Sequence, residues 1–271
     1  MTKTIGVISI KGGVGKTTVS TNLGAVLASE FNKKVLLIDA NFSAPNLGLH
    51  LGVVKPEKAT IHDVLLGKVN PEKATYVHDA GFHFMPGSLV ASGSVDVYSL
   101  KKRMRDFKKN YDVIILDSSP TLNSELLATM LASDELLVVT SPDYPTLSCT
   151  IRAIKLAKQK GVPITGLVLN RKRGKNYELS MKDIEELSEV PVLAVLKDSD
   201  KVLEALANAT PASLYDPMHD VSIEYKKLAG CLIGERYNDP RVMSKIKSIF
   251  AMSRPKEDLN RAALYKDRIK V

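Results

Sequence analysis

The residues most able to do chemistry stand close together near the start of the chain, in the run Lys11-Gly12-Gly13-Val14-Gly15-Lys16-Thr17-Thr18. Glycines let a backbone curl so that successive N–H groups point into one hollow, and a helix that starts there adds its positive dipole end. Such a hollow binds phosphate. Lys16 would reach the β and γ phosphates of a nucleotide, and the Thr17 hydroxyl would hold Mg²⁺.

The context of this run favours a phosphate loop over its alternative, a glycine-rich turn without a ligand. An apolar strand-like run, 5–10, precedes it, and a helical pattern over 18–31 follows. The general pattern GxxxxGK[ST] is not met in full, because Ile10 stands at its first glycine. An additional lysine, Lys11, precedes the glycines instead.

Two carboxylates follow apolar runs that read as strands. Asp39 follows Val35–Ile38, and Asp117 follows Val113–Leu116. The carboxyl ends of parallel strands open onto the ligand crevice of an α/β sheet, so a carboxylate placed there faces the ligand. An aspartate such as Asp117 at the end of a strand is by itself weak evidence for a nucleotide site. In combination with the phosphate loop it is strong evidence.

The run KGGVGKTT resembles the deviant Walker A loop of the MinD/ParA family of ATPases, and the likeness extends over residues 3 to about 252. The resemblance implies ATP and Mg²⁺ as cofactors, and a homodimer that sandwiches two ATP molecules. It implies that Lys11 reaches across the dimer to the partner's nucleotide. It also places Asp39 near Mg²⁺ and its waters, and makes Asp117 a group that contacts Mg²⁺ through water or holds Thr17. The candidate metal set is therefore Thr17, Asp39 and Asp117, and the candidate catalytic set is Lys11, Lys16, Asp39 and Asn41.

Asn41 is the main departure from the family pattern. The resemblance places a water-positioning aspartate there, two residues after Asp39. Asparagine can hold a water by hydrogen bonds but cannot accept its proton. Phosphoryl transfer depends mostly on positioning and electrostatics, so we expect slowed hydrolysis rather than its loss. A slow or non-hydrolysing nucleotide-bound scaffold, or a simple turn residue at 41, are the alternatives.

The resemblance also identifies candidate base-binding residues. Asn170 ends the strand-like run Leu167–Leu169, where the family asparagine bonds adenine. Asp198 follows Val195-Leu196-Lys197, and the family's Ile-Pro-x-Asp proline is absent there. A helix cap is the alternative role for Asp198.

Short apolar runs alternate with helical patterns along the chain, which predicts a doubly wound, mostly parallel α/β sheet with helices on both faces, the P-loop NTPase fold. The predicted strands are 5–10, 35–38, 113–116, 136–140, 167–169 and 192–196. The predicted helices are 18–31, 97–110, 124–132, 147–160, 181–189, 202–208 and 221–233. We expect an ATPase domain over 1–236, an amphipathic helix over 239–252 and a basic tail over 253–271.

The C-terminal part concentrates the positive charge. The chain carries +8 overall, and residues 241–271 hold nine basic and three acidic side chains, so the rest of the chain is nearly neutral. Asp239-Pro240 is a good helix start. An apolar stripe follows, formed by Val242, Met243, Ile246, Ile249 and Phe250. A basic amphipathic helix here predicts an anionic-membrane anchor, with ordinary packing on the domain as the alternative. A second helix around Leu259 is also consistent with the pattern.

These features leave two main functional hypotheses. The first is a MinD-like ATPase that alternates between cytoplasm and membrane, bound peripherally in the ATP state, to position another assembly. The second is a ParA-like partition ATPase whose dimer binds DNA non-specifically, which the nearly neutral body disfavours and the basic tail allows. An iron–sulfur carrier is excluded, because Cys149 and Cys231 form no CxxC pair. One chain does not identify the activating protein partner.

Overall fold

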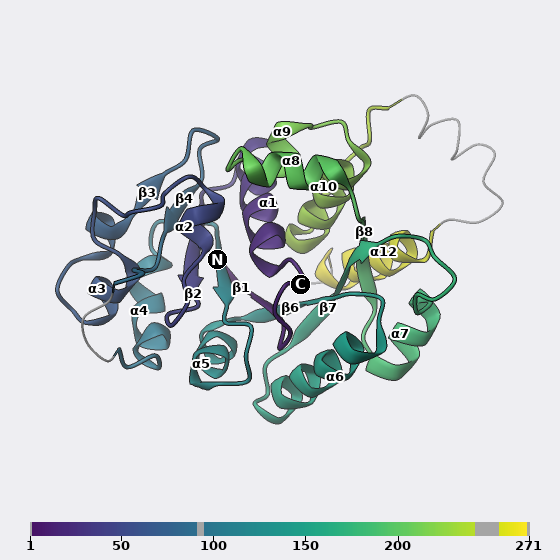
Figure 1. Ribbon diagram of the computed structural model, residues 1–271, viewed down its shortest axis with the longest axis horizontal. Coiled ribbons are helices and arrows are strands. Elements are labelled where there is room, and N and C mark those ends of the chain that lie inside the picture. Colours follow the sequence, from purple (N-terminus) through teal and green to yellow (C-terminus); the bar gives the residue numbers. More distant parts are fainter. Residues whose placement is uncertain (1, 91–94, 242–254, 270–271) are drawn as a thin grey trace.

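The computed structural model describes residues 2–90, 95–241 and 255–269 (Figure 1). Eight strands of these residues form one sheet in the order β3-β4-β2-β5-β1-β6-β7-β8, and every pairing is parallel except that of β3 with β4. The strands are β1 Lys3–Ile8, β2 Val35–Ala40, β3 Tyr76–Val77, β4 His83–Met85, β5 Val113–Ser118, β6 Glu135–Thr140, β7 Ile164–Lys172 and β8 Val192–Lys197.

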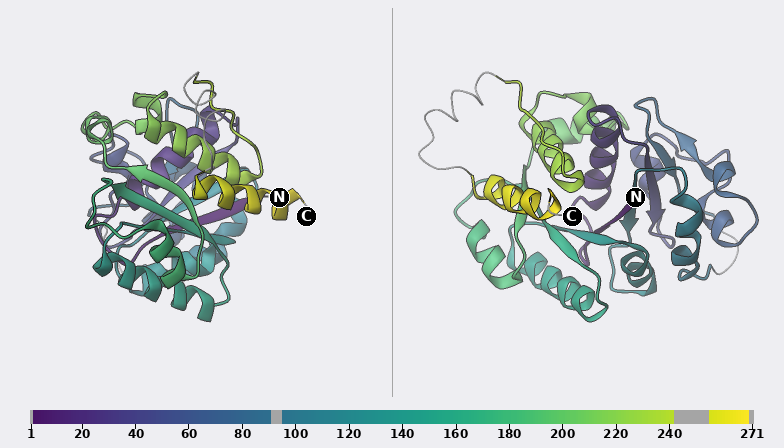
Figure 2. Two further views of the ribbon diagram at one scale, coloured as in Figure 1. Left: turned by 90° about the vertical axis from the view of Figure 1, so that its right-hand side faces the viewer. Right: turned by 180° about the vertical axis from the view of Figure 1, so that it is seen from behind.

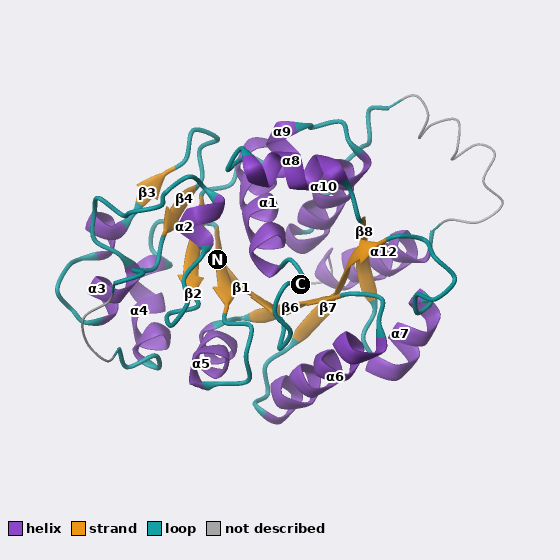
Figure 3. Cartoon of the chain, viewed as in Figure 1, coloured by secondary structure: helices purple, strands orange, loops and turns teal. Residues whose placement is uncertain are grey.

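Helices cover both faces of the sheet, as Figure 3 shows. They are α1 Lys16–Ser29, α2 Leu47–His50, α3 Ile61–Leu65, α4 Ser99–Phe107, α5 Ser124–Ala132, α6 Tyr144–Gln159, α7 Met181–Ser188, α8 Asp200–Ala207, α9 Ala212–Tyr215, α10 Asp220–Ile233 and α12 Lys256–Ile269, with a 3-10 turn at Pro71–Ala74. The predicted fold class, a doubly wound and mostly parallel sheet, is confirmed.

The apolar runs became strands because both of their faces are covered. All six residues of β2 and of β5 are buried. Alternate residues of β2 enter different cores: Leu37 joins the core of α1 and α10, whereas Leu36 and Ile38 join the core of α3 and α4 on the other face. A third core lies under α6 and α7. Continuous hydrophobicity is therefore what a strand buried on both sides requires.

Some predicted boundaries were wrong. β1 ends at Ile8 rather than Ile10, and α1 begins at Lys16 rather than at residue 18. α6 begins at Tyr144, because the Asp143 side chain accepts a hydrogen bond from the Thr146 amide and caps the helix. β3 and β4 were not predicted from the sequence, because these strands are too short to show a period.

The C-terminal helix α12 lies across the edge strand β8 and beside α10, as the rear view in Figure 2 shows. The predicted amphipathic helix over 239–252 lies outside the described residues from position 242 onward. The described part of its start is Asp239, whose carboxylate accepts a hydrogen bond from Arg241 Nε at 2.9 Å. Among the described residues, no helix is both long and apolar enough to cross a membrane.

Candidate nucleotide-binding site

The loop between β1 and α1 has the backbone shape that a phosphate needs. Gly13 and Gly15 have φ angles of 76° and 92°, the left-handed region that glycine adopts without strain. Gly15 occupies the N-cap position of α1 with no side-chain cap, so the first helical N–H groups are directed toward a ligand. A Cβ at Gly15 would meet the Asn170 side-chain nitrogen, so a larger residue would displace Asn170 as well as strain the backbone.

The first turn of α1 brings Lys16 and Thr17 against the end of β5. The Thr17 hydroxyl donates a hydrogen bond to Asp117 Oδ2 at 2.6 Å, and the Ser20 hydroxyl donates one to Asp117 Oδ1 at 2.9 Å. Burial lowers the pKa of Lys16, and the nearby Asp117 partly opposes this shift. The loop lysine, the hydroxyl and the strand-end carboxylate therefore form one cluster.

Asp39 lies beside Asp117, because β2 and β5 are neighbours and these two residues are register partners. Its carboxylate accepts backbone hydrogen bonds from Asn41 at 3.1 Å, Asn46 at 2.9 Å and Leu47 at 3.0 Å. Burial, and then the like charge of Asp117, raise the pKa of Asp39 to about 7. Burial likewise raises the pKa of Asp117, although the Thr17 bond opposes it.

This donor set fits Mg²⁺. Two fully buried carboxylates and one hydroxyl are the oxygen ligands that a small divalent cation prefers, together with phosphate and water. After burial, the like charge of Asp117 contributes to the raised pKa of Asp39, and a cation would relieve that repulsion. Thr17, Asp39 and Asp117 are the residues that would hold the ion.

Asn41 holds the turn after β2. It is 4% exposed, and its side-chain nitrogen donates a hydrogen bond to the Ala44 carbonyl. Its Oδ1 is buried without a partner among the described residues. The turn role considered from sequence is therefore present, and one buried acceptor of this side chain remains unpaired among the described residues.

Asn170 lies in β7, two residues before its end, and Asp198 directly follows the neighbouring strand β8, but their surroundings differ. The Asn170 side-chain nitrogen donates to the Val14 carbonyl at 2.7 Å, which ties it to the phosphate loop. The Asp198 carboxylate instead accepts a hydrogen bond from Arg173 Nε at 2.8 Å near the surface. The helix-cap alternative for Asp198 is wrong, because Ser199 is the N-cap of α8.

The structure adds residues to this cluster that sequence reasoning missed. Ser20 follows Lys16 by one helical turn, a spacing that could have identified it. Asn46 Oδ1 lies 3.0 Å from the Thr17 hydroxyl, so it is a second, longer acceptor beside Asp117. Glu125 Oε1 accepts one from the Ser43 amide at 2.9 Å, across 82 positions of sequence that contain no signal for the contact.

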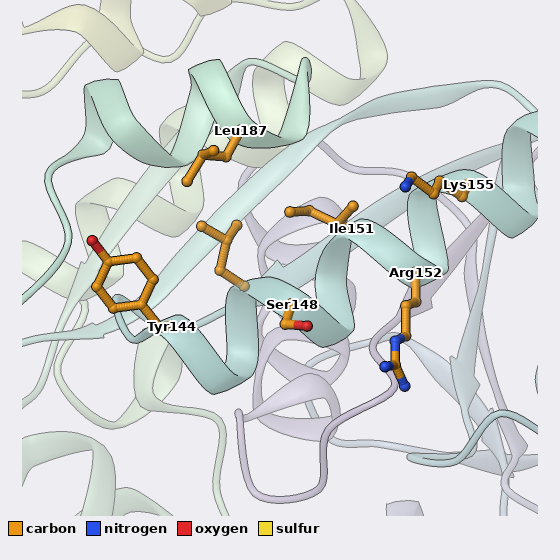
Figure 4. A pocket seen from close by; sticks show the side chains of 7 residues that line it. Tyr144, Ser148, Ile151, Arg152, Lys155 and Leu187 are labelled. Carbon is orange, nitrogen blue, oxygen red and sulfur yellow. The ribbon is translucent and has the colours of Figure 1, made fainter.

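A separate cavity of about 280 Å³ lies between α6 and α7 (Figure 4). Its lining comes from these two helices and is mainly apolar, with Arg152 and Lys155 at one side: Tyr144, Leu147, Ser148, Ile151, Arg152, Lys155 and Leu187. None of these residues belongs to the phosphate loop or to the strand-end cluster, so the cavity and the candidate nucleotide site are distinct.

The fold and the loop together define a P-loop nucleotide-binding protein. A family model described as an AAA domain matches residues 2–161. The septum site-determining protein MinD of Thermotoga maritima is 31% identical over 244 residues, which cover 87% of this chain and 89% of that protein.

Solved structures agree with that match. The septum site-determining protein MinD of Pyrococcus horikoshii, complexed with Mg-ADP, is 30% identical, with a TM-score of 0.79 and coverage of 91% of this chain and 99% of that one. The MinC:MinD cell division protein complex of Aquifex aeolicus has a chain with 27% identity, a TM-score of 0.79, and coverage of 88% and 98%. This chain belongs to the MinD/ParA family of P-loop ATPases.

Proposed function

We propose that this protein hydrolyses ATP with Mg²⁺, forms a homodimer in the ATP state, and in that state binds an anionic membrane surface to position another assembly. The observation that carries the catalytic part is the buried cluster in which Thr17 bonds Asp117 beside Asp39. Mg-ADP in the Pyrococcus relative supports the same nucleotide and ion for this chain.

The loop residues have distinct proposed roles. Backbone N–H groups of residues 12–18 cradle the phosphates, and Lys16 neutralises charge on the β and γ phosphates. Thr17, Asp39 and Asp117 hold Mg²⁺, which supplies further charge neutralisation when bound. Asn170 bonds the base, with Asp198 as a second candidate. Lys11 is exposed, so it is free to reach the nucleotide of a second subunit.

Lys16→Ala tests the nucleotide role. We expect the variant to lose ATP-dependent dimerisation, measured by light scattering with and without Mg-ATP, because no other loop side chain supplies that charge at the β and γ phosphates. Thermal unfolding without nucleotide serves as the folding control. A Lys16→Ala protein that still dimerises with ATP would refute the assignment of the loop.

The proposed membrane role rests on the sequence of residues 242–252. It needs a test that changes these residues and leaves the α12 helix intact. Removing 240–271 would also remove the buried Arg261, so loss of binding would be ambiguous. Ile246→Glu with Ile249→Glu changes the apolar stripe alone. We expect it to abolish ATP-dependent sedimentation with anionic liposomes, whereas Leu259→Glu, on an exposed position of α12, leaves it unchanged. Unchanged sedimentation of the stripe variant rejects the membrane role.

DNA is the second candidate surface, because several basic side chains are exposed on and just after α4. Lys101, Lys102 and Arg105 are exposed on α4, while Lys108 and Lys109 pair with Asp134 and Asp106. Salt-sensitive binding of the ATP-bound protein to any duplex would support a ParA-like role. Lack of retention at low salt would reject it.

A further inference from the structure

Glu125 is a buried carboxylate at the start of α5, a position with no assigned role. It is 7% exposed and lies in the first helical turn, after the N-cap Asn123. Its Oε1 accepts the Ser43 amide hydrogen bond at 2.9 Å.

Glu125 and Asn41 approach the same short turn from different elements. Asn41 donates to the Ala44 carbonyl, and Glu125 accepts from the Ser43 amide, so both side chains bind the backbone within residues 43–44. This juxtaposition joins α5 to the segment after β2, next to the strand end that carries Asp39.

Each of the two side chains has an oxygen without a partner. Among the described residues, Asn41 Oδ1 and Glu125 Oε2 are both buried acceptors with no hydrogen bond. A buried acceptor that stays unpaired costs about 1–3 kcal/mol, so it normally binds an ordered water or a ligand. A water has two protons to donate, so it can bridge two unpaired acceptors whose side chains bind the same turn.

We propose that Glu125 supplies the negative charge that Asn41 lacks, and that the two side chains hold the attacking water of ATP hydrolysis. Asn41 Oδ1 accepts a hydrogen bond from one O–H of the water, and Glu125 Oε2 accepts a hydrogen bond from the other. This inference rests on the proposed ATPase function. The geometric basis of the inference is the turn that both side chains bind and their two unpaired oxygens. Glu125 would then supply the carboxylate beside the attacking water that the asparagine at position 41 does not.

The step balances without a further reactant. The water oxygen attacks the γ phosphorus, and the bond from that phosphorus to the β–γ bridging oxygen breaks, its electron pair leaving with ADP. The proton of the water passes to Glu125, which then releases it to solvent. Phosphate and ADP leave, and nothing is oxidised or reduced. Positioning of water by such a group fits a transition state that is stabilised mainly by electrostatics.

Glu125→Gln is the decisive variant, because it keeps the shape and an oxygen for the Ser43 amide but removes the charge. We expect kcat to fall about 100-fold, in the range of general base contributions. The Kd for Mg-ATP, measured by calorimetry, stays within about twofold, since the phosphate loop is unchanged. Glu185→Gln is the matched control: Glu185 also accepts a backbone amide, that of Val192, but far from the loop, and its variant keeps kcat.

A second variant tests whether Asn41 and Glu125 hold the same water molecule. Asn41→Asp in the Glu125→Gln background returns a carboxylate to the same water, so we expect it to recover at least tenfold of the lost kcat. If Glu125→Gln does not fold, Glu125→Asp and Glu125→Asn form the replacement pair. Of these, the aspartate variant is expected to turn over at least tenfold faster than the asparagine variant.

The outcomes separate this inference from the proposed function. Wild-type protein that does not bind Mg-ATP overturns the proposed function itself. Wild-type protein that binds Mg-ATP but shows no single-turnover hydrolysis overturns the proposed ATPase activity together with the role of Glu125. If the wild type hydrolyses ATP, the variants test Glu125 alone. Wild-type kcat in Glu125→Gln, or no recovery with Asn41→Asp, then overturns its role. Loss of kcat with unchanged Kd and recovery in the double variant supports it.

Discussion

Two regions of this molecule bury charge, and they do so in opposite ways. At the carboxyl ends of β2 and β5, Asp39 and Asp117 are like charges side by side, and burial raises the pKa of each. Beneath α12, Arg261 is 3% exposed and meets Glu224 Oε1 at 2.6 Å and Asp258 Oδ1 at 2.5 Å. In the first region two carboxylates face each other and Lys16 offsets them only in part, whereas in the second region the charges are paired by hydrogen-bonded ion pairs.

This difference in charge balance distinguishes a ligand-binding site from a purely structural contact. A buried ion pair with its hydrogen bonds made is complete by itself, whereas two facing carboxylates become favourable when a cation joins them. Arg261 also donates to the Leu193 carbonyl of β8, so it binds α12 to the sheet edge. We therefore expect the α12 region to govern stability and the strand-end region to govern ligand response.

Arg261→Ala should have the largest effect on stability. Removing the guanidinium leaves Glu224 and Asp258 without their buried partner, which typically costs about 3–5 kcal/mol of unfolding free energy. Urea denaturation would measure the loss, and Mg-ATP affinity should stay near that of wild type. A change below about 1 kcal/mol would mean that α12 contributes little to the fold.

The strand-end carboxylates predict a pH dependence of the ligand-free protein. Asp39 has a raised pKa of about 7 in the folded state, against 3.8 for its ordinary value, so folded protein binds the proton more tightly than unfolded protein does. Its contribution to stability is therefore most favourable below about pH 4, falls as pH rises toward 7, and is constant above that.

Asp39→Asn isolates that contribution. The variant should be more stable than wild type at pH 8 by up to a few kcal/mol, because it removes a buried like charge. It should also lose the Mg²⁺-dependent part of nucleotide affinity, which in wild type should strengthen as pH rises through 7. Thermal unfolding at pH 5 and pH 8 without nucleotide makes the comparison, and an equal difference between the two proteins at both pH values would contradict it.

Ser20→Ala should have an intermediate effect. The Ser20 hydroxyl bonds the buried Asp117 carboxylate at 2.9 Å, and loss of a hydrogen bond to a buried charged group costs about 1–3 kcal/mol. Because that bond favours the ionised form, its removal should raise the pKa of Asp117 further and weaken Mg²⁺ binding. Calorimetric titration of Mg²⁺ into the ATP-bound protein checks this, and unchanged affinity would assign Ser20 to packing alone.

Lys108→Ala should have the smallest effect on the free energy of unfolding, so it serves as the reference for the other variants. Its amino group pairs with Asp134 Oδ1 at 2.8 Å, but both side chains are substantially exposed, at 33% and 46%. Such pairs contribute about 0–1 kcal/mol, because solvent screens them. Urea denaturation should give a curve close to that of wild type. A loss as large as that of Arg261→Ala would remove the distinction between buried and exposed pairs drawn above.

Much of the fold was predictable because its signals are local. Runs such as Val35–Ile38 are continuously apolar, so they had to be strands covered on both faces, and their alternation with helical patterns required a parallel sheet. The loop from Lys11 to Thr18 was equally readable, since its function depends on glycines and on the first helical turn that follows.

Other features depended on contacts between distant segments. β4 is only three residues long, and it is a strand because Phe84 and its neighbours pair with β2. The α12 helix was visible as a helical pattern, but its attachment through Arg261 and Glu224 links positions 37 apart. The residues next to each position in the sequence do not indicate such strand pairings or ion pairs.

The sequence by itself determined the sheet, the phosphate loop and the strand ends that carry Asp39 and Asp117, because each follows from patterns within a few residues. Only the tertiary structure decided that these carboxylates are register partners, that Asn170 lies against the loop, and that Glu125 meets the turn after Asn41. The physical reason is that burial and electrostatic interaction depend on distance in space, which the packing of helices on a sheet sets and the order of residues does not show.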